Sequence, residues 1–266
     1  MLSDGIGTGI ECAVYVLVAG AVAQAGSLLF DRWYRRQRKP GNSEVSGLMF
    51  GATSLIYSLI LAFVIIAVWS DYEELKVTIG KEADKMNNVL AHSGTLPDSL
   101  SFPIKQAMNA YCYTVITQEW NLKEAELDQF PNAVRALRIM LLHIETGGSQ
   151  QSVLNTINND LDMITDLRRE RLDHVRSHVP GAVWLILGAG SGIIVFFSYF
   201  LELPFLRLKR LYLFLLSSMI GMSFFLVDAL SSPFSGPAAV SKQPYESILL
   251  KMEQHLLLFP HQNKPA

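Results

Sequence analysis

One stretch of the sequence carries small polar and aliphatic side chains at a spacing that suits an ion pathway. Residues 47–69 are strongly apolar, and six of them share one face of a helix with 3.6 residues per turn. Serines near one end would wet the mouth of a path, and the aliphatic side chains would form a constriction that closes by dewetting. The candidate pore-lining residues are Ser54, Tyr57, Ser58, Leu61, Ile65 and Val68.

The same residues also fit a purely structural interpretation. In that interpretation Ser54 and Ser58 donate hydrogen bonds to carbonyls one turn earlier in their own helix, and the aliphatic side chains face lipid. The residues alone leave both interpretations open.

The residue types that catalysis inside a membrane requires are not grouped in this sequence. Gly190-Ser191-Gly192 is similar to a serine nucleophile motif, but no apolar run contains a histidine to activate the hydroxyl. His174 and His178 lie one turn apart, yet the arginines around them would repel a metal cation. We therefore expect a packing role for Ser191, no enzyme activity, no metal site and no cofactor.

Strongly polar residues are rare in the apolar runs. Glu11, Glu202 and Asp228 fall near the ends of the runs, where water or headgroups solvate a charge. Gln24 lies well inside the first run, and we expect it to make a hydrogen bond between helices.

Small residues four positions apart mark places where helices can approach closely. Gly188 and Gly192 form one such pair, and Ser217 and Gly221 form another. Packing within one chain and contact between subunits both explain such pairs.

Four apolar runs must position all of these residues. Residues 9–30, roughly 47–69, 181–201 and 211–229 are nearly free of charge. Each is about twenty residues long, which at 1.5 Å per residue crosses a hydrocarbon core of roughly 30 Å. The net charge of −2 gives no electrostatic basis for binding nucleic acid. Because no Lys or Arg precedes the first run, we expect it to remain as a span.

Basic residues in the two short loops indicate the orientation. The first loop has five, and the second has Arg207, Lys209 and Arg210. An excess of basic residues marks the cytoplasmic side of a membrane. We therefore predict an integral protein of a bacterial inner membrane, with the N-terminus, the central domain and the C-terminus external.

The central polar stretch is expected to be helical. Apolar residues recur from Trp69 to about His92 at helical spacing, which predicts that the second span continues as one long amphipathic helix. Further helices are expected at 104–120, from Pro131 to about 147, and at 153–175, packed as a bundle. The basic run at 168–176 is expected to meet lipid phosphates or to pair with the acidic Asp71, Glu73 and Glu74. Cys12 and Cys112 are expected to be free thiols.

Several motifs occur together along most of the chain. They are GLMFG at 47–51, VWSDYEE at 68–74, RRERL at 168–172, PGAVW at 180–184 and PFSG at 233–236, with Glu82, Tyr111, Glu119-Trp120 and Pro244-Tyr245. In this order they resemble the bestrophin-like family of membrane proteins, long classed as a domain of unknown function and found mostly in bacteria. The motif residues singled out as candidates are Trp69, Tyr72, Glu82, Trp120, Arg171, Pro180, Pro233, Phe234 and Gly236.

The resemblance has one departure and one conflict. The family usually has an Asp just ahead of the Pro-Phe pair, where this chain has Ser231 and Ser232. Bestrophins are pentameric ion channels with a pore lined by the second span, and their helical domain is cytosolic. We keep the external orientation because the charge of the short loops is a direct physical bias.

The sequence therefore predicts an all-α membrane protein with four transmembrane helices and a helical bundle inserted between spans two and three. The expected parts are a transmembrane hairpin at 1–69, the bundle at 70–179, a second hairpin at 180–230 and a C-terminal tail at 231–266. The preferred function is a homo-oligomeric ion channel, a pentamer by resemblance, whose partners are the lipid bilayer, its own copies and ions. The alternative is a non-conducting sensor or scaffold whose external bundle binds a ligand or partner.

Overall fold

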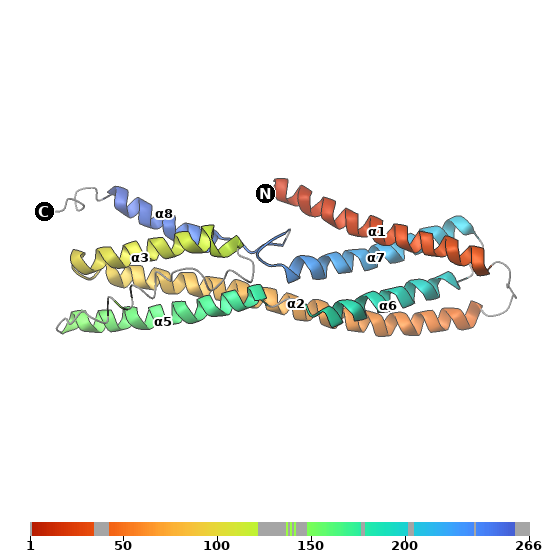
Figure 1. The fold of residues 1–266 in the computed structure, drawn as a ribbon, viewed down its shortest axis with the longest axis horizontal. Helices are drawn as coiled ribbons and strands as arrows, with labels where there is room; N and C mark the ends of the chain where they lie inside the picture. The colour runs from red at the N-terminus through yellow and green to blue at the C-terminus, as the bar shows by residue number, and fades with distance from the viewer. Residues whose placement is uncertain are drawn as a thin grey trace. The chain divides into compact units, whose positions relative to one another are not determined.

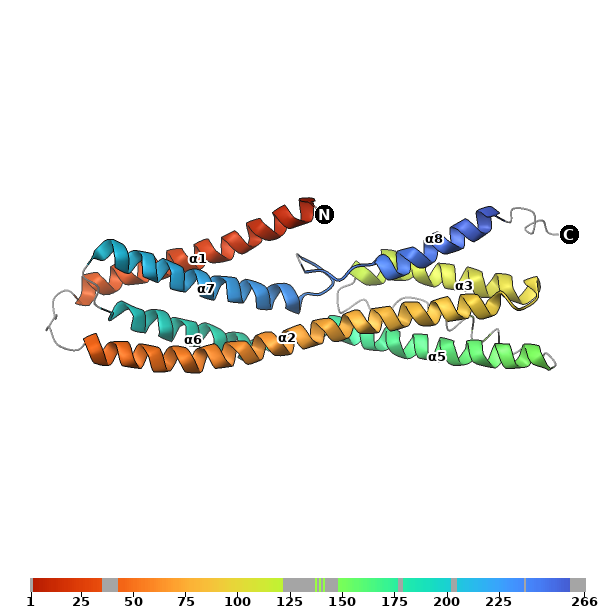
Figure 2. The same ribbon diagram turned by 180° about the vertical axis from the view of Figure 1, so that it is seen from behind.

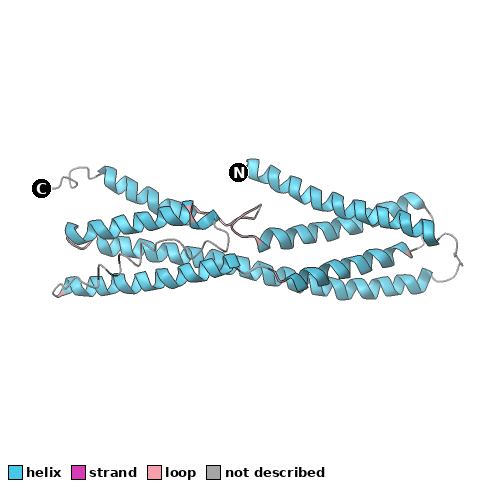
Figure 3. Ribbon diagram, in the orientation of Figure 1, coloured by secondary structure: helices cyan, strands magenta, loops and turns pink. Residues whose placement is uncertain are grey.

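The structure is a computed structural model that describes residues 2–34, 43–121, 137, 139, 141, 148–176, 179–201, 205–236 and 238–258. All regular elements among these residues are helical, which confirms the predicted fold class (Figure 3). In chain order they are α1 (Leu2–Tyr34), α2 (Ser43–Ser93), α3 (Asp98–Thr117), the short 3-10 helix η1 (Glu119–Asn121), α5 (Ser149–Arg176), α6 (Gly181–Tyr199), α7 (Leu206–Ser231) and α8 (Gln243–Leu258) (Figure 1).

The chain divides into two compact units. Unit 1 comprises Met1–Tyr72 and His178–Ala239, and unit 2 comprises Glu73–Ser177 and Val240–Ala266. The predicted boundaries of the bundle and its helix from Pro131 stay predictions, because most of residues 122–147 lie outside the described residues. Helix α8 was not predicted, since the sequence analysis treated residues 231–266 only as a tail.

Among the described residues, four helices are long and apolar enough to cross a membrane, as the four apolar runs predict. Their candidate spans are Gly7–Trp33, Val45–Ser93, Gly181–Tyr199 and Leu206–Ser231. Helix α2 has 51 residues, which corresponds to about 75 Å at 1.5 Å per residue. This length far exceeds a hydrocarbon core of roughly 30 Å. The predicted continuation of the second span to about His92 is therefore confirmed.

Within unit 1, α1 and α7 run side by side in both views (Figure 2). A glycine allows the closest approach: a Cβ built on Gly221 would lie 2.8 Å from the carbonyl oxygen of Tyr15. Gln24 donates a hydrogen bond of 2.8 Å to the carbonyl of Arg210, which confirms its predicted role between helices. The pair Ser217 and Gly221 thus serves packing within one chain.

The other pair of small residues, Gly188 and Gly192 on α6, has no closely packed neighbour among the described residues. A Cβ built on Gly188 or Gly192 of α6 would meet no atom within 4 Å. Gly190, between them, lies against the ring of Tyr57, where a Cβ would come within 2.5 Å of the ring. Among the described residues, only the face of α6 that carries Gly190 is therefore used for close packing on α2.

Unit 2 contains the C-terminal half of α2 with α3, η1, α5 and α8. Its core consists of apolar side chains that recur at helical spacing on each helix, such as Leu75 and Ile79 on α2 and Ile157 and Leu161 on α5. Helix α8 packs along α3. Several of the polar contacts between these helices converge on one arginine.

Candidate functional site

The predicted pore face of α2 lies against helices of the same chain. Val68 is buried in a core with Leu187 of α6 and Val227 and Leu230 of α7. Leu61 and Ile65 pack against this core. The aliphatic part of the predicted face therefore fills the interior of unit 1.

The polar residues of that face are also occupied within the chain. Tyr57 is buried, and its hydroxyl donates a hydrogen bond of 3.2 Å to the carbonyl of Leu187. Ser58 donates to the carbonyl of Leu55 at 2.8 Å, as the structural interpretation expects. The hydroxyl of Ser54 is buried and has no partner among the described residues. That these six residues line a path stays a prediction, and packing within unit 1 is what the structure shows them doing.

The opposite face of α2 is apolar and uncovered. Leu55, Leu59 and Ile66 have exposed fractions of 72%, 58% and 63%. At 100° per residue they lie about half a turn around the helix from Tyr57. Among the described residues this face meets no other helix of the chain, so it is available to lipid or to another copy.

A second cluster, in unit 2, is built around a fully buried arginine. Arg171 of α5 has no exposed surface, and its Nε donates to Oε2 of Glu82 at 2.8 Å. Its Nη2 donates to Oε2 of Glu119 at 2.8 Å. Arg168 pairs with the other oxygen of Glu119 at 2.6 Å, and Tyr111 donates to Glu82. Two carboxylates and two guanidinium groups thus balance each other's charge.

Helix α8 closes this Arg171 cluster with aromatic and basic side chains. The guanidinium carbon of Arg171 lies 5.8 Å from the ring centroid of Tyr245, and the rings of Tyr245 and Trp120 meet edge to face at 6.0 Å. Lys242 lies over the Trp120 ring and donates to the carbonyl of Ile116 at 3.1 Å. Nη1 of Arg171 and the hydroxyl of Tyr245 are buried without a hydrogen-bond partner among the described residues.

The pKa values of the cluster follow from burial and from its charges. Burial alone would raise the pKa of Glu119, but the nearby charges of Arg171 and Arg168 outweigh it and lower that pKa below its ordinary 4.5. Burial would lower the pKa of Arg171, yet Glu82 and other neighbours raise it well above its ordinary value. Burial, followed by the charge of Glu82, raises the pKa of Tyr111 and Tyr245 well above 10.0 and that of Cys112 to about 12. At neutral pH Glu119 and Arg171 are therefore charged, and the two phenols and the thiol are neutral.

Comparison with known proteins identifies the family of this chain. The model of the Bestrophin-like domain matches residues 17–245. The chain belongs to the bestrophin-like family. No curated protein sequence matches this bestrophin-like chain significantly.

Solved structures similar to the bestrophin-like chain include variants of a bacterial bestrophin homologue from Klebsiella pneumoniae. A leucine-to-threonine variant has a TM-score of 0.69 at 13% identity, with 94% of this chain and 99% of that chain covered. An isoleucine-to-threonine variant has a TM-score of 0.68 at 14% identity, with 93% and 99% covered. A tryptophan-to-alanine variant has a TM-score of 0.69 at 15% identity, with 92% and 95% covered. At these identities the likeness shows that the fold is shared.

The structure brings together about half of the motif residues of the bestrophin-like chain. Glu82, Trp120 and Arg171 meet in the Arg171 cluster, where Tyr111, Glu119 and Tyr245 join them. The functional role of these residues stays a prediction, but their position explains why motifs far apart in the sequence occur together.

The remaining motif residues lie elsewhere. Trp69 and Tyr72 are neighbours on α2, with ring centroids 6.3 Å apart. Pro180 occupies the N-cap position of α6. Pro233 and Phe234 form the turn after α7, and Gly236 closes this segment with φ of +83°, a conformation that favours glycine.

The prediction that the basic run on α5 pairs with the acidic residues at 71–74 was wrong for Arg168 and Arg171. Arg168 and Arg171 pair with Glu119 and Glu82 rather than with the acidic residues at 71–74. Arg171 lies seven residues after Ile164, which itself lies seven after Ile157, so it continues the buried stripe of α5. That spacing was the sequence signal that would have identified a buried arginine.

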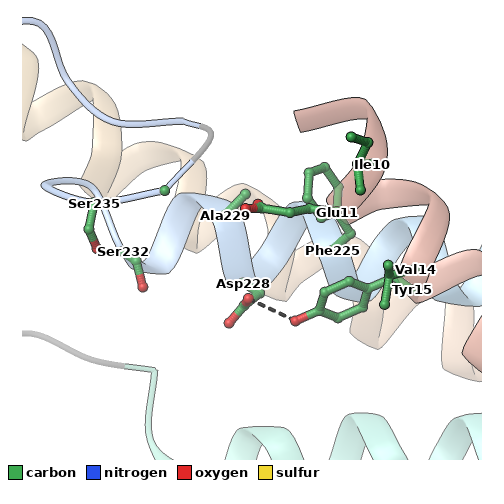
Figure 4. Close-up of a pocket in the computed structure, with 10 residues that line it drawn as sticks. Ile10, Glu11, Val14, Tyr15, Phe225, Asp228, Ala229, Ser232 and Ser235 are labelled. Atoms are coloured by element: carbon green, nitrogen blue, oxygen red, sulfur yellow. Dashed lines mark hydrogen bonds between the residues drawn. The ribbon is translucent and has the colours of Figure 1, made fainter. Parts of the chain in front are cut away.

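One cavity of about 390 Å³ lies in unit 1 where α1, the end of α7 and the following turn meet (Figure 4). Apolar side chains line it together with Glu11, Ser232 and Ser235. Tyr15 donates a hydrogen bond of 2.8 Å to Asp228 at its edge. Glu11 and Asp228 are exposed, and each lies near the end of a candidate span, whereas Glu202 lies outside the described residues. Solvation of these carboxylates stays a prediction.

Proposed function

We propose that the chain forms a homo-oligomeric ion channel of the bestrophin-like kind, with the second span lining the path. Membership of the bestrophin-like family supports the channel class. The observation that carries the proposal is the uncovered apolar face of α2, which includes Leu55, Leu59 and Ile66. Because the inner face of α2 is filled by packing on α6 and α7, the path lies between copies and is lined by this outer face.

A ring of copies is the arrangement that the physics of the spans favours. Where α2, α6 and α7 meet, packed apolar side chains leave no path for ions within one chain. Apolar helix faces arranged around an axis give a constriction that conducts when it is wetted. A pentamer follows from the resemblance to bestrophins.

Serine substitutions distinguish the two faces of α2. We expect Leu59→Ser and Ile66→Ser, on the outer face, to hydrate the constriction and raise ion leak severalfold in reconstituted liposomes, with little change in the thermal unfolding temperature. We expect Leu61→Ser, on the inner face, to lower that temperature without raising the leak, because it places a hydroxyl in a packed core.

Leu185→Ser on α6 is the matched control, because Leu185 is as exposed as the outer residues of α2 but lies on another span. It should leave the ion leak unchanged. If Leu61→Ser raised the ion leak in well-folded protein, the result would indicate that the inner face of α2 lines the path. No conductance from the wild type or from any variant, in protein shown to be oligomeric, would favour the non-conducting sensor or scaffold.

We propose further that the protein lies in a bacterial inner membrane with its N-terminus, unit 2 and C-terminus external. Eight basic residues in the short loops at 31–40 and 202–210 support this orientation. In a chain with Cys12 replaced by serine, an impermeant maleimide applied to intact cells should label Gln106→Cys, which is exposed on α3, and spare Gln37→Cys. Buried Cys112 should add no background. Labelling of Gln37→Cys alone would establish the reverse orientation.

A further inference from the structure

The end of α1 and the start of α7 are tied together at one membrane boundary of unit 1. Lys209 of α7 forms an ion pair of 3.3 Å with Asp31 of α1. About two turns earlier on α1, Gln24 donates a hydrogen bond to the carbonyl of Arg210. Residues within a turn of these contacts therefore lie close to each other in space.

Three arginines in this region have no ionic partner among the described residues. Arg32 follows Asp31 directly, and Arg207 and Arg210 flank Lys209. All three are exposed, and none forms an ion pair with any residue that the structure describes. Because Lys209 pairs with Asp31, the three guanidinium groups form a positive patch that no described acidic residue neutralises. This patch is here called the boundary patch.

Apolar side chains border the boundary patch. Trp33 and Phe205 have exposed fractions of 72% and 69%, and Leu206 is similarly exposed. Trp33 lies at the end of one candidate span and Leu206 at the start of another, so all three side chains are at the depth of the headgroups. Tryptophan is favoured at that depth because its ring is apolar and its N–H is polar.

We propose that the boundary patch binds the phosphate of an anionic phospholipid, whose acyl chains lie along the exposed ends of α1 and α7. A guanidinium group offers two parallel N–H donors to a phosphate, which makes arginine the preferred side chain for this contact. The position of the patch at the ends of two spans selects a lipid headgroup over a soluble anion. Each arginine near an anionic membrane surface contributes about a fivefold gain in binding, so three together give roughly a hundredfold.

Lipid titration of the full chain tests this proposal. The protein is held in nanodiscs of phosphatidylcholine, phosphatidylglycerol is added, and bound lipid is counted by native mass spectrometry. We expect the variant Arg32→Gln/Arg207→Gln/Arg210→Gln to bind phosphatidylglycerol roughly a hundredfold more weakly than the wild type. Raising the salt concentration should weaken binding to the wild type and leave the variant nearly unaffected.

Arg169→Gln is the matched control, because Arg169 is an exposed arginine on α5 and belongs to unit 2 rather than to the patch. It should keep the affinity of the wild type. Equal affinity of the triple variant and the wild type would overturn the proposal, and so would displacement of the lipid by millimolar inorganic phosphate, which would identify a site for a soluble anion. If the triple variant unfolds in phosphatidylcholine, Arg207→Gln and Arg210→Gln are measured singly, with about a fivefold loss expected for each.

Discussion

Replacing Arg171 with methionine is expected to destabilise unit 2 by about 3–5 kcal/mol, because it removes the positive partner of two buried carboxylates. Glu82 and Glu119 are both buried, and after the substitution only Arg168 would remain, paired with Glu119. Thermal unfolding of the purified protein, followed by the fluorescence of Trp120 and the other tryptophans, measures the effect.

Arg169→Met is the control for this substitution. Arg169 lies two residues earlier on the same helix but is exposed, and its ion pair with Asp166 is worth at most about 1 kcal/mol. The combined change Arg171→Met/Glu82→Gln/Glu119→Gln should recover part of the loss, because it leaves no unpaired buried carboxylate. If Arg171→Met cost no more than Arg169→Met, the cluster would not hold unit 2 together.

The second large effect is expected from Gly221→Val, which should destabilise unit 1 by about 1–3 kcal/mol or more. A Cβ at this position would lie 2.8 Å from the carbonyl oxygen of Tyr15 and 3.1 Å from the Cβ of Ala19. Because the first of these atoms belongs to the backbone of α1, no side-chain rotation relieves the clash. The helices would have to separate along their whole contact.

Gly188→Val on α6 is the matched control, because it is also a glycine-to-valine change within a candidate membrane span. A side chain at Gly188 meets no atom within 4 Å in one chain. Thermal unfolding of both variants in detergent should show a marked loss for Gly221→Val and a small change for Gly188→Val. Equal losses of thermal stability in the two variants would show that α1 does not approach α7 as closely as in the structure.

The spans and the length of α2 could be predicted from the sequence, because hydropathy and helical period depend on residues close together in the chain. The sequence could not predict which helix or which environment each face of a helix contacts. Tyr57, Leu61 and Val68 share a face in any helix, but their period is the same whether that face meets α6 or lines a path. Helix α8 was missed for a related reason: its buried residues Tyr245 and Ile248 span only one turn. The Arg171 cluster was missed because the basic run was expected to meet lipid phosphates or the acidic residues at 71–74. The heptad spacing from Ile164 instead indicated a buried position for Arg171.

The burial of Cys112 has a consequence for the redox behaviour of the protein. Only a thiolate attacks a disulfide or is readily oxidised, and burial raises the pKa of this thiol to about 12. At pH 7 roughly one molecule in 100,000 would carry the thiolate. Cys112 is therefore chemically silent while unit 2 stays folded, and its reaction with a thiol reagent reports each transient opening of the helices that surround it.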